Sequence, residues 1–300
     1  MRKILLASTA LVALGSFSAH AADISISGGY NFIYTVDGEN TTDETDTGAE
    51  GDVNIKFSNT TDSGITTTLN YGLHETGVGA GGQAYDDLNA SMSSDFGTIY
   101  FDSAGDDTAL GGFDAKSDKA GEGSQTGALQ GIMGTNNLSI GYKLPAVMDG
   151  LTIAVSSSDT DDSGEYFGYG IGYNMGMLNA SYVKEGTNTV EATYAGVSAS
   201  FGEISLGVDS VDRDNGGAAT ADREAIGYGA SYAMGDITLA YEMGSLDDGA
   251  GTDISDHSQI AASYAVAPGI TAIITQSEVD VADAGGTDED KLEIQLKLAF

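Results

Sequence analysis

The sequence predicts an all-β protein of sixteen strands, and one feature that recurs along the chain indicates this fold. Apolar and polar residues alternate along many separate stretches, which is the pattern of a strand with one apolar face. Glycine is abundant, with 43 residues, while proline is rare, with 2 residues, so the chain resembles neither collagen nor a proline-rich linker. The last ten residues, KLEIQLKLAF, show the alternation in its clearest form.

The first residues predict export. Arg2 and Lys3 precede the apolar stretch 4–14, and the letters AHA follow in the pattern of a cleavage site that ends at Ala21. The apolar part is too short to span a membrane as a helix. We therefore predict a signal peptide over residues 1–21 and a single domain over residues 22–300.

The composition excludes several classes of function. The chain has 11 Lys and Arg residues against 45 Asp and Glu residues, a net charge of −34 that repels nucleic acid. With 15 Tyr, 9 Phe and 41% hydrophobic residues, the chain is not disordered throughout. It has no cysteine and hence no disulfide, and its domain has no run of 18 apolar residues that would form a transmembrane helix.

Each predicted strand is a stretch of period-two alternation. In 24–36 the even-numbered residues are mostly apolar and the odd-numbered ones mostly polar, and in 166–174 aromatic residues alternate with glycine. In the strand 188–201 the phase slips between Tyr194 and Val197, which indicates a bulge. The sixteen predicted strands are 24–36, 52–58, 65–74, 86–94, 98–103, 136–144, 151–158, 166–174, 177–184, 188–201, 204–212, 224–233, 236–244, 257–266, 270–277 and 291–300.

The connectors differ in length on the two rims of the predicted sheet. After even-numbered strands they are short, as at Gly202-Glu203 and Met234-Gly235. After odd-numbered strands they are mostly longer and acidic, and the stretches 37–51 and 278–290 each hold six acids and no base. Short turns on one rim and long loops on the other are typical of a transmembrane antiparallel β-barrel.

The two faces of the strands also favour a membrane barrel. The polar faces are rich in Ser, Thr, Asn and Gly, which are too small to fill a barrel as a packed core. In a membrane the sheet must close, because open edges would leave unpaired backbone groups in lipid, and sixteen closed strands enclose an aqueous channel. A charge in the membrane midplane costs about 2–4 kcal/mol, so Glu293 and Lys297 should face the lumen while Leu296 and Leu298 face lipid.

With these features the chain resembles the Gram-negative general porins, in particular those of the alphaproteobacteria. The resemblance covers the whole chain. Its most specific part is the ending, where alternating apolar residues lead to a terminal Phe300 and look like the signal read by the barrel assembly machinery. The stretch FGTIYF (96–101) is similar to the strand before the long third loop of these porins, and the turns FGE and MGD add to the likeness.

The resemblance implies a homotrimer of sixteen-stranded barrels in the outer membrane, each with its third loop folded into its own pore. The candidate loop is 104–135, with acids that would face a basic wall across the constriction. The implied constriction residues are Asp106, Asp107, Asp114, Asp118 and Glu122. The implied basic wall residues are Lys56, Lys143 and Lys297. The implied assembly signal is Leu296, Leu298 and Phe300. Further implied partners are outer-membrane lipid, lipopolysaccharide and the assembly machinery.

The family commonly has a cluster of arginines on the pore wall, and this chain has few basic residues for such a wall. We place Arg213 and Arg223, the two arginines beyond the signal peptide, in an outer loop.

The chemistry of an enzyme is missing from the pattern. Only His74 and His257 remain after the signal peptide, at predicted strand edges, and no cysteine or distinctive serine accompanies them. The stretch DTDDSGE (159–165) begins like a calcium loop, but its twelfth position is Gly170 instead of Glu. We expect no catalytic site and no required cofactor, and the acidic loops leave bound Ca²⁺ open.

The sequence therefore predicts a passive diffusion channel for small hydrophilic solutes that prefers cations. The alternative is a structural or adhesive barrel whose acidic loops bind divalent cations or a partner. An exported hydrolase is a more distant third reading, because no nucleophile–base pair stands out. Conductance separates the first two readings, because a merely structural barrel would not conduct.

Overall fold

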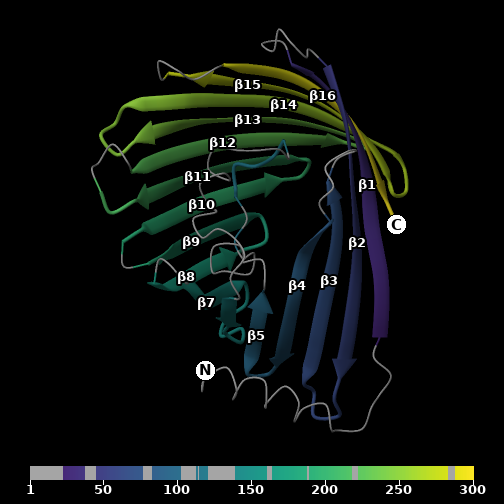
Figure 1. Cartoon of the computed structure of the whole chain (residues 1–300), viewed down its shortest axis with the longest axis vertical. Helices are drawn as coiled ribbons and strands as arrows, with labels where there is room; N and C mark the ends of the chain where they lie inside the picture. Colours follow the sequence, from purple (N-terminus) through teal and green to yellow (C-terminus); the bar gives the residue numbers. More distant parts are fainter. Residues whose placement is uncertain are drawn as a thin grey trace.

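A computed structural model shows a closed barrel of sixteen antiparallel strands (Figure 1). The structure describes residues 23–37, 45–76, 83–102, 113, 115–120, 139–160, 164–187, 189–217, 222–282 and 288–300. Each strand pairs with its neighbours in sequence, and β1 closes the ring by pairing with β16. The predicted signal peptide lies outside the described residues and stays a prediction. Among the described residues, no helix is long and apolar enough to cross a membrane.

All sixteen predicted strands are present. The strands are β1 (Asp23–Asp37), β2 (Thr45–Thr60), β3 (Thr66–Thr76), β4 (Gln83–Ser94), β5 (Gly97–Asp102), β6 (Ser139–Lys143), β7 (Leu151–Thr160), β8 (Gly164–Asn174), β9 (Leu178–Gly186), β10 (Glu191–Phe201), β11 (Ile204–Asp214), β12 (Arg223–Met234), β13 (Ile237–Asp248), β14 (Asp253–Ala267), β15 (Ile270–Val281) and β16 (Glu289–Ala299).

One prediction about β2 and one about β10 were wrong. Residues 45–51 are part of β2 and do not belong to an acidic loop, because small polar residues continue the pairing with β1 beyond the apolar part of the strand. The expected bulge in β10 is also absent, since its register with β9 and β11 runs without a shift. The phase slip arises because Tyr194 is a large side chain on the inner face, where it is buried.

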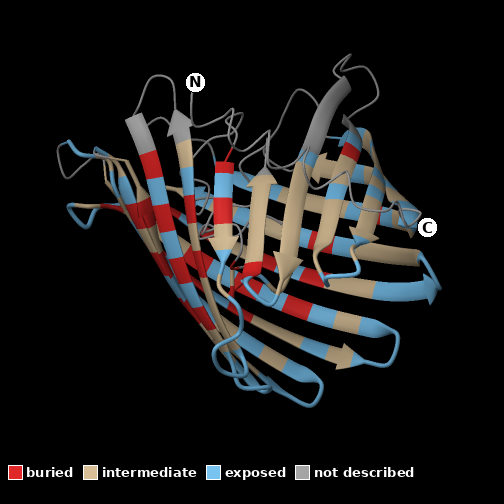
Figure 2. Ribbon diagram, turned by 90° about the horizontal axis from the view of Figure 1, so that it is seen from below, coloured by how far each residue is buried: buried red, intermediate tan, exposed pale blue. Residues whose placement is uncertain are grey.

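The alternation along each strand separates two environments (Figure 2). Large apolar side chains are exposed on the outer face, among them Ile24, Ile26 and Phe32 of β1 and Ile294 and Leu296 of β16. The register pairs Phe32 with Leu296, so one apolar surface continues across the seam of the ring. This outer band is the surface that a membrane barrel turns to lipid.

The short connectors are turns built on glycine. Gly202 and Gly235 each begin a two-residue connection and have φ of 61°, a left-handed conformation that glycine adopts without strain. The sequence predicted both turns. Because these connections are so short, they hold β10 against β11 and β12 against β13 in a fixed register, and these strands carry the inner wall described next.

Candidate functional site in the barrel lumen

A segment of the long connector between β5 and β6 lies against the inner wall of the barrel. Residues 113 and 115–120, named here the docked segment, are the part of this connector that the structure describes. Asp209 of β11 holds its middle: Oδ2 accepts hydrogen bonds from the backbone N–H groups of Lys116 (2.5 Å) and Ser117 (2.7 Å), and Oδ1 accepts one from Ser117 Oγ (2.7 Å). A buried carboxylate with three donors is a strong anchor.

Glu242 of β13 holds the end of the docked segment. Its Oε2 accepts hydrogen bonds from the backbone N–H groups of Lys119 (3.2 Å) and Ala120 (3.4 Å). The other carboxylate oxygen, Oε1, lies 3.7 Å from Nε2 of His257 on β14, too far for a hydrogen bond. Glu242 and His257 are both buried on the inner wall. The sequence placed His257 at a strand edge, whereas it lies inside β14.

Glycines on the inner wall make room for the docked segment. A Cβ at Gly207 would lie 1.6 Å from the carbonyl oxygen of Lys116, and a Cβ at Gly229 would lie 1.8 Å from that of Ser117. A Cβ at Gly170 would lie 2.1 Å from the Phe113 ring. The docked segment therefore lies closer to the backbone of the inner wall than any side chain at these positions would allow.

Apolar packing completes the attachment. Phe113 is 6% exposed and forms a small core with Ala154, Val183, Tyr194 and Val211, which lie on β7, β9, β10 and β11. These wall residues face inward, opposite to the outer apolar band. One side of the lumen is therefore lined by polar groups. On the other side the docked segment packs against the wall and excludes water.

The structure describes one of the five predicted constriction residues. Asp118 lies exposed on the docked segment, between Ser117 and Lys119, whose backbone groups are bound to the wall. Asp106, Asp107, Asp114 and Glu122 lie outside the described residues. The constriction role of all five remains a prediction.

The three predicted wall lysines all have inward-facing positions in the strand register. Lys56 of β2 pairs with Ser25 and Asn70, and Lys297 of β16 pairs with Asn31. Lys143 is the last residue of β6 and therefore stands at the rim of the short connectors. Glu293 shares the inner face with Lys297, as the alternation predicted.

The two arginines are not in an outer loop, which corrects the sequence interpretation. Arg213 belongs to β11 and Arg223 begins β12, and the two are direct cross-strand partners. They share a strand face with Val211 and Asp209, so they face the lumen on the wall that carries the docked segment. The prediction ended β11 at residue 212, two residues too early, and began β12 at residue 224, one residue too late, because polar residues interrupt the apolar alternation where the pairing still continues.

Sequence reasoning missed the two anchors Asp209 and Glu242. A signal was present, because each acid lies in the apolar middle of its strand: Asp209 directly follows Val208, and Glu242 stands between Tyr241 and Met243. A charge inside a membrane strand is expensive unless it faces inward and is bonded. Within the described ranges, no group of three or more His, Cys, Asp or Glu residues is arranged to hold a metal ion.

The closed barrel with a segment fixed inside its lumen defines a class of protein, the transmembrane channel. A family model described as Gram-negative porin matches residues 7–284. The chain belongs to this family of outer-membrane channel proteins, which are not enzymes.

Solved structures share the fold. An engineered variant of Rh. blastica porin with one alanine-to-tryptophan change has a TM-score of 0.72 at 18% identity, and another with a lysine and an arginine changed to alanine has 0.70 at 19%. A third, titled "Asymmetric conductivity of engineered proteins", has 0.71 at 19%. Each comparison covers 93% of this chain and 100% of the other. No curated protein sequence matches this chain.

Proposed function

We propose that this porin is a general diffusion channel that prefers cations over anions. Small hydrophilic solutes would pass through the water-filled lumen beside the docked segment, selected by size and by the field of the wall, without covalent chemistry. The observation that carries this proposal is the attachment of the docked segment to one wall by Asp209 and Glu242. A segment fixed in this way narrows the lumen to a defined opening.

The charge of the inner wall supports the cation preference. Across from the docked segment, on β1, β2 and β16, the inward-facing positions of the register include more acids than bases. The acids are Asp23, Asp46, Glu50, Asp52, Glu289 and Glu293, and the bases are Lys56, Lys291 and Lys297. A wall of one dominant sign concentrates counter-ions in a water-filled passage that is bounded by low-dielectric protein.

The assembly of the protein is part of the same proposal. Each protomer would join two others in a homotrimer in the outer membrane, surrounded by lipid and lipopolysaccharide, after removal of residues 1–21. Phe300, Leu298 and Leu296 would be read by the barrel assembly machinery. The family membership supports these partners.

Single-channel conductance in a planar bilayer, with the reversal potential measured under a salt gradient, tests the proposal. We expect stepwise insertions in threes and a cation-selective reversal potential. Changing Lys56 or Lys297 to Gln should increase the cation selectivity, while the outward-facing Lys184→Gln control should leave it unchanged. An anion-selective reversal potential would refute the cation preference, and a folded barrel without conductance would favour the structural alternative.

A further inference from the structure

Two buried polar side chains on the inner wall face each other without forming a hydrogen bond. Glu242 of β13 and His257 of β14 are 1% and 7% exposed, and Glu242 Oε1 lies 3.7 Å from His257 Nε2. Neither atom has a hydrogen-bond partner in the part of the chain that the structure describes. An unpaired polar group inside a protein costs free energy, so two such atoms at one place indicate a site for a third partner that binds both.

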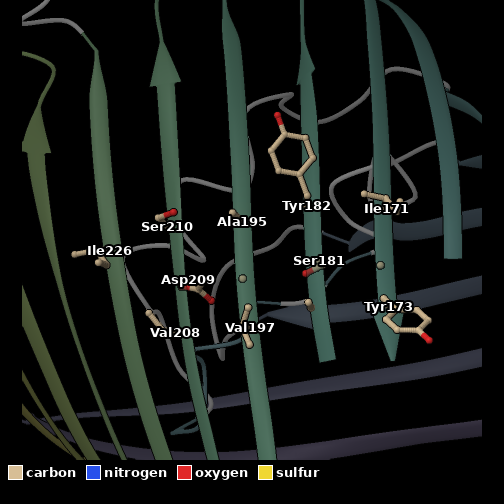
Figure 3. A pocket seen from close by; sticks show the side chains of 13 residues that line it. Ile171, Tyr173, Ser181, Tyr182, Ala195, Val197, Val208, Asp209, Ser210 and Ile226 are labelled. Carbon is tan, nitrogen blue, oxygen red and sulfur yellow. The ribbon is translucent and has the colours of Figure 1, made fainter. Parts of the chain in front are cut away.

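The surroundings of this pair are polar and acidic. Gln259 is buried beside it as the direct cross-strand partner of Glu242, and its amide Nε2 has no hydrogen-bond partner among the described residues. The carboxylates of Asp118 on the docked segment and Asp209 on β11 both interact electrostatically with Glu242. Figure 3 shows Asp209 on β11, next to Val208 of the outer face. Several carboxylates around one point favour a cation as the third partner.

The separation of the two atoms fits a metal ion better than a shared proton. A hydrogen bond between nitrogen and oxygen needs about 2.7–3.2 Å. Zn²⁺ binds imidazole nitrogen at about 2.0–2.1 Å and carboxylate oxygen at about 2.0–2.2 Å, so an ion that bridges atoms 3.7 Å apart makes an angle of about 125° with them. The tetrahedral angle that Zn²⁺ prefers needs a separation only about 0.3 Å shorter.

The ligand types decide which cation fits. Ca²⁺ and Mg²⁺ prefer oxygen ligands, so an imidazole nitrogen matches them poorly. A nitrogen and a carboxylate oxygen together suit Zn²⁺ and the neighbouring transition metals. Both strands turn these side chains inward, so the ion would arrive from the lumen.

We propose that Glu242 Oε1 and His257 Nε2 bind a divalent transition-metal ion of the Zn²⁺ type as it passes through the lumen. This inference names a class of solute for the proposed channel and rests on that function for the passage of the ion. Two protein ligands leave two positions of the tetrahedron to water, so the ion is held loosely enough to leave, as conduction requires. Glu242 Oε2 keeps its hydrogen bonds from Lys119 and Ala120, because the ion uses the other oxygen.

Metal binding to the folded protein in detergent tests the site directly. Because the acidic chain attracts every divalent cation, Zn²⁺ binding is measured by equilibrium dialysis in a large excess of Mg²⁺. We expect one bound Zn²⁺ per chain, with an affinity about tenfold lower in His257→Gln, equivalent to about 1.4 kcal/mol. His74→Gln on β3 is the matched control, because it removes the other histidine beyond the predicted signal peptide, and it should bind Zn²⁺ like the unchanged protein.

Electron paramagnetic resonance with Cu²⁺ as the probe gives a second readout that needs no variant. The spectrum of the unchanged protein should show splitting from one imidazole nitrogen, lost in His257→Gln and retained in His74→Gln. A spectrum with oxygen ligands alone would overturn the site. Equal Zn²⁺ affinities of the unchanged protein and His257→Gln would also overturn it, since binding would then be adventitious. Displacement of Zn²⁺ by the excess Mg²⁺ would overturn the choice of metal.

The reversal potential reports separately on the pore. A bound ion adds two positive charges beside the docked segment, so Zn²⁺ should reduce the cation selectivity of the unchanged protein but not that of His257→Gln. A barrel that binds Zn²⁺ without conducting would refute the proposed channel and keep the site. A conducting channel that binds no Zn²⁺ would refute the site alone.

Discussion

Asp209→Asn should release the docked segment from the wall without unfolding the barrel. The carboxylate accepts three hydrogen bonds from Lys116 and Ser117, two of them from backbone N–H groups. Asparagine keeps the size of the side chain but has only one acceptor oxygen. Its amide N–H groups would face the N–H and O–H donors of the docked segment. The variant therefore removes the anchor with little change in volume.

The size of the effect follows from these bonds. Hydrogen bonds to a charged group contribute about 1.5–3 kcal/mol each. The single acceptor oxygen of asparagine can still accept part of this hydrogen bonding. We expect a loss of about 2–4 kcal/mol in the attachment, which shifts the docked equilibrium toward release by a factor of roughly 30 to 1,000. Glu242 and Phe113 still hold the segment, so release should be intermittent.

Single-channel recording is the assay. We expect frequent brief closures and increased open-channel noise, because a released segment stays joined to β5 and β6 and can cross the lumen. Asp212→Asn, on the outer face of the same strand, makes the same charge change away from the docked segment. This variant should give the same single-channel recordings as the unchanged protein. Adding Ser117→Cys and Gly227→Cys should restore quiet recordings under oxidising conditions. A Cβ at Gly227 would lie 3.0 Å from Ser117 Cβ, and a separation larger by about half an ångström is within the range of a disulfide. Unchanged recordings of the Asp209 variant would refute the anchoring role.

Three further predictions concern packing and closure. Gly207→Ala should displace the docked segment and disturb the current, because its Cβ would overlap the Lys116 carbonyl. The control Gly48→Ala, whose Cβ would have its nearest contact at 3.7 Å, should leave the current unchanged. Equal currents from the two variants would contradict this account. Phe113→Ala should weaken attachment by about 3–5 kcal/mol, the usual cost of emptying such a core site, seen as faster proteolysis of the connector with unchanged thermal unfolding of the barrel. Deleting Phe300 should lower the amount of assembled protein in outer-membrane fractions, and normal amounts would exclude its role as an assembly signal.

The sequence predicts the strands well because, in a membrane barrel, every second residue of a strand faces the same environment. Ile24 to Val36 alternate with polar residues since one face meets lipid and the other meets water, and no tertiary detail is needed to see this. Ends of strands are harder, as Arg213 and Arg223 show. Pairing between strands continues through polar residues near the rims, where neither environment demands an apolar side chain.

The inner site was less predictable, because its residues depend on contacts between distant segments. The period-two pattern marks Asp209 as inward-facing but does not reveal that the connector after β5 supplies its donors. The same holds for Gly207 and Gly229, which look like ordinary strand glycines in the sequence. Tyr194 even misled the prediction, because its apolar ring faces the small core inside the lumen and breaks the expected alternation.

The pairing of β1 with β16 has a consequence for how the protein forms. Gly28 and Phe300 exchange two backbone hydrogen bonds, of 3.1 and 3.0 Å, across the greatest sequence separation in the fold. Contacts of long separation are slow to form, and until this one exists both terminal strands expose unpaired edges. Until this contact forms, β1 and β16 can pair with other chains, so closure of the ring also removes the route to aggregation through open strand edges.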